Sequence, residues 1–118
     1  MVSQTVAPRR QPECKLDFHV ERRPHLLIVG IRGEASFDQA EVISAKLLRV
    51  PLDACSLVVL DLAELTLLSS LVMGALVEYR RGVGRRGVEV RLANVQGPVW
   101  LELELAGLWN LFEPMDLE

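Results

Sequence analysis

Four short segments of the chain have the hydrophobic pattern of β-strands. In residues 15–20 (KLDFHV) apolar and polar residues alternate, which is typical of a strand with one buried face. Residues 56–61 (SLVVLD) have a continuous apolar centre rich in β-branched residues, which indicates a strand buried on both faces. A short polar turn separates the first two strands, so we predict that they pair as a hairpin. The predicted strands are residues 15–20, 25–32, 56–61 and 88–92.

A helix is predicted after the second strand. Gly33 breaks the strand pattern, and Ser36 with Gln39 fits a capping box, in which the serine receives helix N–H groups and the glutamine reaches back. Apolar residues then recur at helical spacing as far as Arg49, and Pro51 ends the helix.

Two further helices follow the third and fourth strands. Residues 71–81 have the apolar pattern of a helix packed on a sheet. Residues 98–106 begin with Pro98, a favoured first residue of a helix, and precede Gly107, a favoured C-terminal cap. The resulting order, β-β-α-β-α-β-α, predicts an α/β fold in which a sheet with parallel neighbours is covered by helices.

The composition is that of one small domain with an aliphatic core. Half of the 118 residues are hydrophobic, only six are aromatic, and the formal net charge of −3 argues against nucleic-acid binding through overall charge. Residues 1–13 are polar, lack an apolar run of signal-peptide length and are expected to form a disordered tail. The longest uncharged stretch in the middle of the chain, residues 65–77, is shorter than the roughly 20 residues of a spanning helix. We therefore expect a cytoplasmic protein with neither a membrane nor a nucleic-acid partner.

The cysteines and histidines show no motif of catalysis or metal binding. Cys14, Cys55, His19 and His25 belong to no CxxC or His/Cys cluster, so neither a zinc site nor a disulfide framework is predicted. No nucleophile, base and orienting partner can be assembled from the residue pattern. We expect no catalytic residue, no cofactor and no metal ion.

Two other features have an ordinary structural interpretation. Asp61 and Glu64 follow a strand, where ligands bind in open α/β sheets, but loop and cap residues of this kind are common. Gly82, Gly84 and Gly87 form a literal GxGxxG, yet they follow a helix and precede a strand. The dinucleotide motif requires the opposite order, so a helix-to-strand turn is predicted.

Five arginines gather around that glycine turn. They fit a phosphate or nucleic-acid patch, but no aromatic residue other than Tyr79 lies among them to stack on bases. Arginines at a helix C-terminus also complement the helix dipole and keep a sheet edge soluble, which is the interpretation we favour. A contact surface for an acidic protein partner stays open. The cluster comprises Arg80, Arg81, Arg85, Arg86 and Arg91.

Two serines stand where a buried strand leads into a helix. Ser69 and Ser70 are at the predicted N-terminus of the helix, beside unsatisfied N–H groups and the positive end of the helix dipole. An N-cap serine is common at such a position. A phosphoserine would also be stabilised there by charge-assisted hydrogen bonds, so both interpretations remain.

Residues 57–76 resemble the core of the STAS domain of anti-sigma factor antagonists. In that family a strand ends in Asp-Leu-Ser-Gly, a short hydrophobic stretch follows, and Asp-Ser-Ser-Gly-Leu-Gly-Ala-Leu opens a helix. Residues 33–34, 87–94 and 103–112 are also similar to family segments, so the resemblance assigns residues 14–118 to one STAS domain. It implies an α/β fold with a mixed sheet of four to five strands and helices packed against it. The residues that match in register are Asp61, Leu62, Thr66, Ser70, Gly74, Ala75 and Leu76.

The resemblance implies a regulatory protein that is not an enzyme. Members of the family bind an anti-sigma factor that is also a serine kinase, which phosphorylates a serine at the helix start, and a phosphatase reverses the reaction. Ser70 occupies that position, and Ser69 is a second candidate acceptor. Kinase and phosphatase are therefore the expected partners of a monomer or weak homodimer. The residues expected to contact a partner are Thr66, Ser69, Ser70, Leu71 and Met73.

Three positions depart from the family pattern. Ser69 stands where the family has aspartate, Leu71 replaces the second serine, and Val72 replaces the following glycine. These departures leave two alternatives open. One is a phosphorylation-independent STAS scaffold or partner-binding module, and the other is a small-ligand or nucleotide sensor that uses the loop after Asp61.

Overall fold

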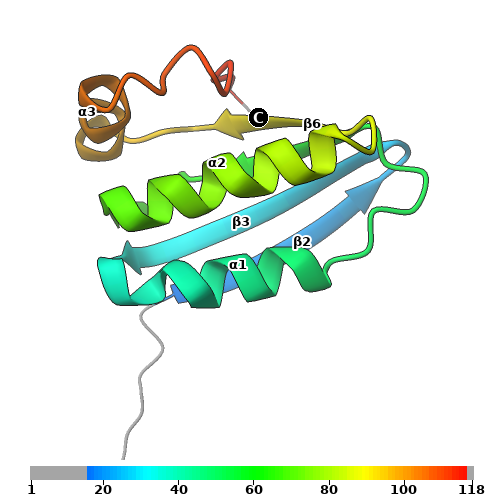
Figure 1. Ribbon diagram of the computed structural model, residues 1–118, viewed down its shortest axis with the longest axis horizontal. Helices are drawn as coiled ribbons and strands as arrows, with labels where there is room; N and C mark the ends of the chain where they lie inside the picture. The colour runs from blue at the N-terminus through cyan, green and yellow to red at the C-terminus, as the bar shows by residue number, and fades with distance from the viewer. Residues whose placement is uncertain (1–15, 117–118) are drawn as a thin grey trace, which may run out of the picture.

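The computed structural model describes residues 16–116, which form a five-stranded mixed sheet with helices packed against it (Figure 1). The predicted disordered tail, residues 1–13, and Cys14 lie outside the described residues. The strands are β2 (Leu16–Arg23), β3 (Leu26–Ala35), β4 (Leu57–Asp61), β5 (Leu65–Leu68) and β6 (Glu89–Ala93). The helical elements are η2 (Phe37–Gln39), α1 (Ala40–Arg49), α2 (Ser70–Gly84) and α3 (Gly97–Leu105).

The sheet is mixed because one hairpin precedes a set of parallel crossovers. Its order is β2-β3-β4-β6, and β5 pairs with the far end of β3. β2 and β3 are antiparallel up to the pair Arg23↔Leu26, which leaves Pro24 and His25 as a two-residue turn. His25 follows Pro24 and adopts a φ of 64°, which is the pattern of a type II turn. The predicted hairpin is confirmed, and β3 runs parallel to β4 and β5, as β4 does to β6.

β3 is longer than the hydrophobic pattern indicates. The prediction that Gly33 breaks the strand is wrong: Gly33 has a φ of 113° and forms a bulge, after which β3 continues to Ala35. The extension pairs with β5, a strand that is not among the four predicted strands. β5 is only four residues long and does not alternate, because its two ends are buried and its centre is exposed. Such a pattern carries no period-two signal.

The predicted capping box before α1 is also wrong. Ser36 makes no side-chain hydrogen bond to a helix N–H. Its Oγ donates instead to Asp38 Oδ1 at 2.7 Å, and the Gln39 amide donates to the Ser36 carbonyl at 2.9 Å. A 3₁₀ turn therefore replaces the first turn of the expected helix, and α1 begins at Ala40.

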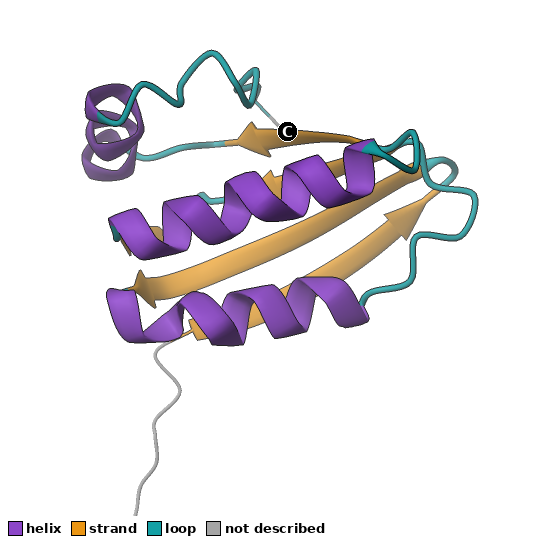
Figure 2. Cartoon of the chain, viewed as in Figure 1, coloured by secondary structure: helices purple, strands orange, loops and turns teal. Residues whose placement is uncertain are grey.

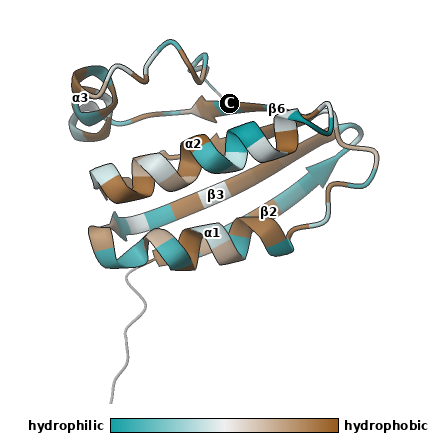
Figure 3. Ribbon diagram, viewed as in Figure 1, coloured by the Kyte–Doolittle hydropathy of each residue, from teal (hydrophilic) through white to brown (hydrophobic). Residues whose placement is uncertain are grey.

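Both faces of the central strands are buried. α1 and α2 lie across one face of the sheet (Figure 2), and the main core forms between them and β3, β4 and β6. On the opposite face a smaller cluster consists of Ile28, Val59 and Ala93, with Leu26, Leu57 and Met115 packed against it. Burial on both faces explains why β3 is apolar along most of its length. The C-terminal end of β2, by contrast, is exposed and hydrophilic (Figure 3).

The glycine-rich motif closes α2. Gly82 and Gly84 lie in the last turn of the helix, and Gly87 follows with a φ of 81°. The Gly87 amide donates to the Gly84 carbonyl at 3.0 Å, and the Val88 amide donates to the Val83 carbonyl at 3.1 Å. The predicted helix-to-strand turn is confirmed, because these bonds satisfy the last carbonyls of a helix at its end.

Two glycines of this region are expected to respond oppositely to substitution by alanine. Gly74 is exposed in the interior of α2 with space around its Cα, so Gly74→Ala should raise the free energy of unfolding by about 0.5–1 kcal/mol. Gly87 also has space, but its positive φ is strained for alanine, so Gly87→Ala should lower it by about 1–2 kcal/mol. Urea denaturation of both variants checks this, and equal signs would contradict it.

Tyr79 is expected to make the folded state sensitive to alkali. The residue is 6% exposed, and within the described residues its hydroxyl has no hydrogen-bond partner. Burial, with a smaller contribution from Cys55, raises the pKa of Tyr79, although Arg86 opposes the shift. Above pH 10.0, the ordinary value, the unfolded chain releases the phenol proton more readily than the folded chain. The free energy of unfolding therefore falls as the pH rises through this range.

Tyr79→Phe isolates this effect. The variant should lose part of the stability decrease above pH 10.0 and remain within about 1 kcal/mol of the parent at pH 7, because the phenylalanine leaves no buried hydroxyl unpaired. Urea denaturation across the alkaline range measures both. Identical pH dependence of parent and variant would contradict the assignment.

Candidate functional site

The junction between β5 and α2 holds the two predicted serines in different ways. Ser69 has extended backbone angles and is the N-cap of α2, where its Oγ accepts a hydrogen bond from the Val72 amide at 3.3 Å. Its own amide donates to the Ala35 carbonyl at 2.9 Å, which ties the junction to the end of β3. Ser70 is the first residue of the helix and is exposed. The sequence position thus contains both a cap and an accessible hydroxyl.

Thr66 fixes the strand that leads into this junction. Its Oγ1 donates to the Gly33 carbonyl at 3.0 Å, and the Gly33 amide donates to the Glu64 carbonyl at 3.0 Å. The hydrogen bonds lie at the bulge of β3, where regular ladder pairing is interrupted. Thr66 is exposed, so it supports the backbone and also belongs to the surface beside Ser70.

Three large apolar side chains are exposed on the elements that meet at this junction. Leu71 of α2 is 58% exposed, Leu67 of β5 is 41% exposed, and Phe37 of η2, which packs against α2, is 68% exposed. Exposed apolar residues that gather on a small domain often mark an interaction surface. We call the exposed residues Phe37, Thr66, Leu67, Ser70 and Leu71 the Ser70 surface.

Met73 does not belong to this surface. It is 5% exposed and lies in the main core, so its prediction as a partner-binding residue is corrected. Helical periodicity explains the difference, because Leu71 and Met73 are two positions apart and lie on different faces of α2. Val72 is also fully buried, and the replacement of the family's glycine therefore alters the core rather than the surface. Phe37 and Leu67 were missed because the motifs that contain them, the predicted capping box and the hydrophobic stretch of the family pattern, assign no role to these two positions.

The helix terminus at the start of α2 favours an added negative charge. The positive end of the helix dipole lies at Ser70, and the first turn contains no acidic residue. Phosphorylation there would place a charge of about −1.5 to −2 against helix N–H groups, which is a stabilising arrangement. The hydroxyl therefore lies where a phosphate is compatible with the folded helix.

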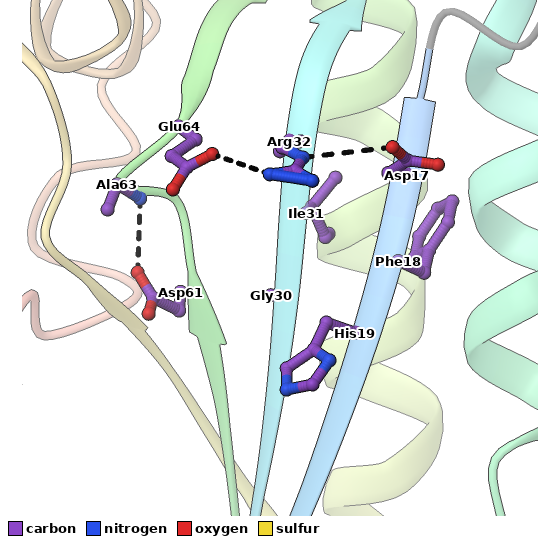
Figure 4. Close-up of a pocket in the computed structure, with 9 residues that line it drawn as sticks. All are labelled: Asp17, Phe18, His19, Gly30, Ile31, Arg32, Asp61, Ala63 and Glu64. Atoms are coloured by element: carbon purple, nitrogen blue, oxygen red, sulfur yellow. Dashed lines mark hydrogen bonds and ion pairs between the residues drawn. The ribbon is translucent and has the colours of Figure 1, made fainter.

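Away from the Ser70 surface, a hollow of about 390 Å³ lies on the sheet face opposite the helices (Figure 4). Gly30 has no side chain and leaves the space between His19 of β2 and the end of β4 open. Arg32 lies between two carboxylates, with Glu64 Oε1 at 3.1 Å from Nη1 and Asp17 Oδ2 at 3.7 Å from Nε. This network pairs Asp17, Arg32 and Glu64, which leaves Asp61 as the remaining carboxylate of the lining.

Asp61, Cys55 and His25 each contact polar groups of the protein itself. Asp61 Oδ1 accepts hydrogen bonds from the Ala63 amide at 3.0 Å and from Asn94 Nδ2 at 3.1 Å. Cys55 Sγ donates to the Leu57 carbonyl at 3.1 Å, and the His25 ring lies 3.3 Å from the Ala54 carbonyl. Within residues 16–116, no three His, Cys, Asp or Glu side chains are grouped to hold a metal ion.

Comparison with known proteins agrees with this geometry. The sequence profile of the STAS domain matches residues 17–117, which is most of the chain. The chain belongs to the STAS domain family. A search of curated proteins finds no match. Within the described residues, no helix is both long and apolar enough to cross a membrane.

Solved structures of other STAS proteins share the fold. The unphosphorylated form of the Bacillus anti-sigma factor antagonist SpoIIAA is 19% identical, with a TM-score of 0.69 over 86% of this chain and 89% of that chain. An anti-sigma factor antagonist from Mycobacterium paratuberculosis is 21% identical, with a TM-score of 0.73 over 84% of each chain. A sulfate transporter family protein from Wolinella succinogenes is 19% identical, with a TM-score of 0.64 over 75% of this chain and 71% of that chain. The predicted fold, a mixed sheet with packed helices, is confirmed.

The two serines are expected to differ in their contribution to stability. Ser69→Ala removes the acceptor for the Val72 amide and should lower the free energy of unfolding by about 1 kcal/mol. Ser70→Ala, at an exposed position without a capping bond, should change it by less than about 0.5 kcal/mol. Thermal and urea denaturation of both variants checks the assignment of the cap. A larger loss for Ser70→Ala than for Ser69→Ala would contradict it.

Proposed function

We propose that this STAS domain is a regulatory protein similar to the anti-sigma factor antagonists. In this proposal it binds an anti-sigma factor that is a serine kinase, and phosphorylation of Ser70 switches that binding. The observation that carries the proposal is the exposure of Ser70 at the first position of α2, beside exposed apolar residues of the Ser70 surface.

The contacts of the two serines favour Ser70 over Ser69 as the acceptor. A kinase must reach the hydroxyl oxygen from solvent, and Ser70 is exposed. Ser69 is only partly exposed, and its oxygen accepts the Val72 amide. Phosphorylation of Ser69 would modify the oxygen that serves as the N-cap. Phosphorylation of Ser70 would therefore leave the N-cap hydrogen bond of α2 intact, whereas phosphorylation of Ser69 would disturb it.

A phosphate on Ser70 would change the surface in a way that suits a switch. The neighbouring Leu71 and Phe37 are apolar and exposed, so a partner that covers them removes the adjacent charge from water. Burying a divalent phosphate without paired cations is unfavourable. The phosphorylated form should accordingly bind an apolar partner face more weakly than the unmodified form.

Fewer of the three departures from the family pattern alter the partner-binding surface than the sequence suggests. Val72 is buried, so only Ser69 and Leu71 change what a partner meets. Leu71 adds an exposed apolar side chain beside the acceptor. This change is consistent with a partner that has a matching apolar recess, and with the same switch.

Phosphate transfer from a kinase tests the proposal. The protein is incubated with ATP and an anti-sigma factor of the serine kinase type from the same organism. Intact-mass spectrometry should show one added phosphate on the parent and on Ser69→Ala, and none on Ser70→Ala. Ser69→Ala is the matched control, because it lacks the neighbouring hydroxyl and retains Ser70.

Binding of the same kinase completes the test. Ser70→Asp should bind at least about tenfold more weakly than the parent, since a carboxylate at this position mimics part of the phosphate charge. Isothermal titration calorimetry measures the difference. Unchanged affinity together with no phosphate uptake would support the phosphorylation-independent module instead.

A further inference from the structure

The two ends of the domain carry opposite charges. At the carboxyl ends of β3, β4 and β6, where α1 and α2 begin (Figure 1), exposed carboxylates come from several elements. Arg32, near this end, is already engaged by Asp17 and Glu64. We call this the acidic end, and the exposed carboxylates used here are Glu34, Glu41, Glu102 and Glu104.

The opposite end carries a groove whose lining contains three arginines and two glutamates. Its volume is about 560 Å³, and it runs between the C-terminal turn of α2 and β6. Among the described residues, neither Arg80 nor Arg85 has an ion-pair partner, whereas Arg81 contacts Glu78 at 2.7 Å. We call it the arginine groove, and the lining residues used here are Arg80, Arg81, Arg85, Glu89, Leu111 and Glu113.

The distance between the ends keeps these charges from neutralising one another within one molecule. α2 has 15 residues, and at a rise of about 1.5 Å per residue it separates its two ends by about 20 Å. The Debye length is about 8 Å at physiological ionic strength. Neither end therefore screens the other, and each can attract a second molecule.

We propose that copies of this chain associate head to tail, with the arginine groove of one copy receiving the acidic end of the next. The occupant is a second copy because the same molecule presents the complementary charge. Phe37 and Leu71 supply exposed apolar side chains within the acidic end, and Leu111 supplies an apolar wall in the groove. The contact joins two different surfaces, so each added copy leaves one free acidic end and one free groove.

This arrangement has a measurable consequence for Ser70. A copy whose acidic end is docked has its Ser70 surface covered, so association and binding of another protein to that surface exclude each other. The association itself requires no kinase. Its failure and the failure of the proposed phosphorylation are therefore distinguishable.

Sedimentation velocity of the full chain over a range of concentrations tests the proposal. The weight-average sedimentation coefficient should rise with concentration at low salt, and the association constant should fall about tenfold or more between about 20 and 300 mM NaCl, because exposed charges are screened. A monomer at every concentration in low salt would overturn the proposal.

Two charge-reversed variants and their mixture identify the surfaces. Arg81→Glu/Arg85→Glu adds negative charge to the arginine groove, and Glu34→Lys/Glu41→Lys removes negative charge from the acidic end; all four residues are exposed. Each variant alone should lose association by about tenfold or more, whereas an equimolar mixture should regain it. Circular dichroism verifies that both variants fold. Persistent association of either variant alone, or a mixture that stays monomeric, would overturn the head-to-tail contact.

Discussion

The length of β3 decides where the candidate site lies. Its first half pairs with β4, and the bulge at Gly33 lets the strand continue and pair with β5. The Ala35 carbonyl at its end accepts the Ser69 amide at 2.9 Å, so the start of α2 is attached to the sheet rather than to a free loop. Ser70 is presented next to this anchor. An exposed hydroxyl on a rigid frame can be modified without disturbing the core.

The segregation of charge follows from the same topology. In a parallel crossover the helix runs back along the sheet, so α1 and α2 both begin at the carboxyl end of the strands. Acidic residues near helix N-termini and basic residues near helix C-termini complement the helix dipoles. Glu41 lies in the first turn of α1 and Arg49 ends that helix, while Arg81 lies in the last turn of α2. Two helices in the same direction therefore place Glu41 at the Ser70 end and Arg49 and Arg81 at the other.

Clear hydrophobic patterns predicted most of the helices and strands correctly, whereas β5 and the start of α1 were predicted wrongly. β4 and β6 have apolar patterns that are unambiguous over five residues, and they lie where expected. β5 was missed because its burial pattern has no period of two. The capping box failed because Ser36 had a nearer partner, Asp38, only two residues away. The capping-box motif specifies only its first and fourth residues, so it does not take account of a competing partner between them.

The sequence by itself determined the order of most elements, the serine pair at a helix start and the resemblance that assigns the family, because each depends on residues that are close in the chain. Only the tertiary structure separated the capping Ser69 from the exposed Ser70, removed Met73 from the surface and added Phe37 to it. It also placed Arg80, Arg81 and Arg85 along one groove, at the end of the domain opposite Ser70. Burial and charge separation depend on which elements pack together, and long-range strand pairing sets that packing.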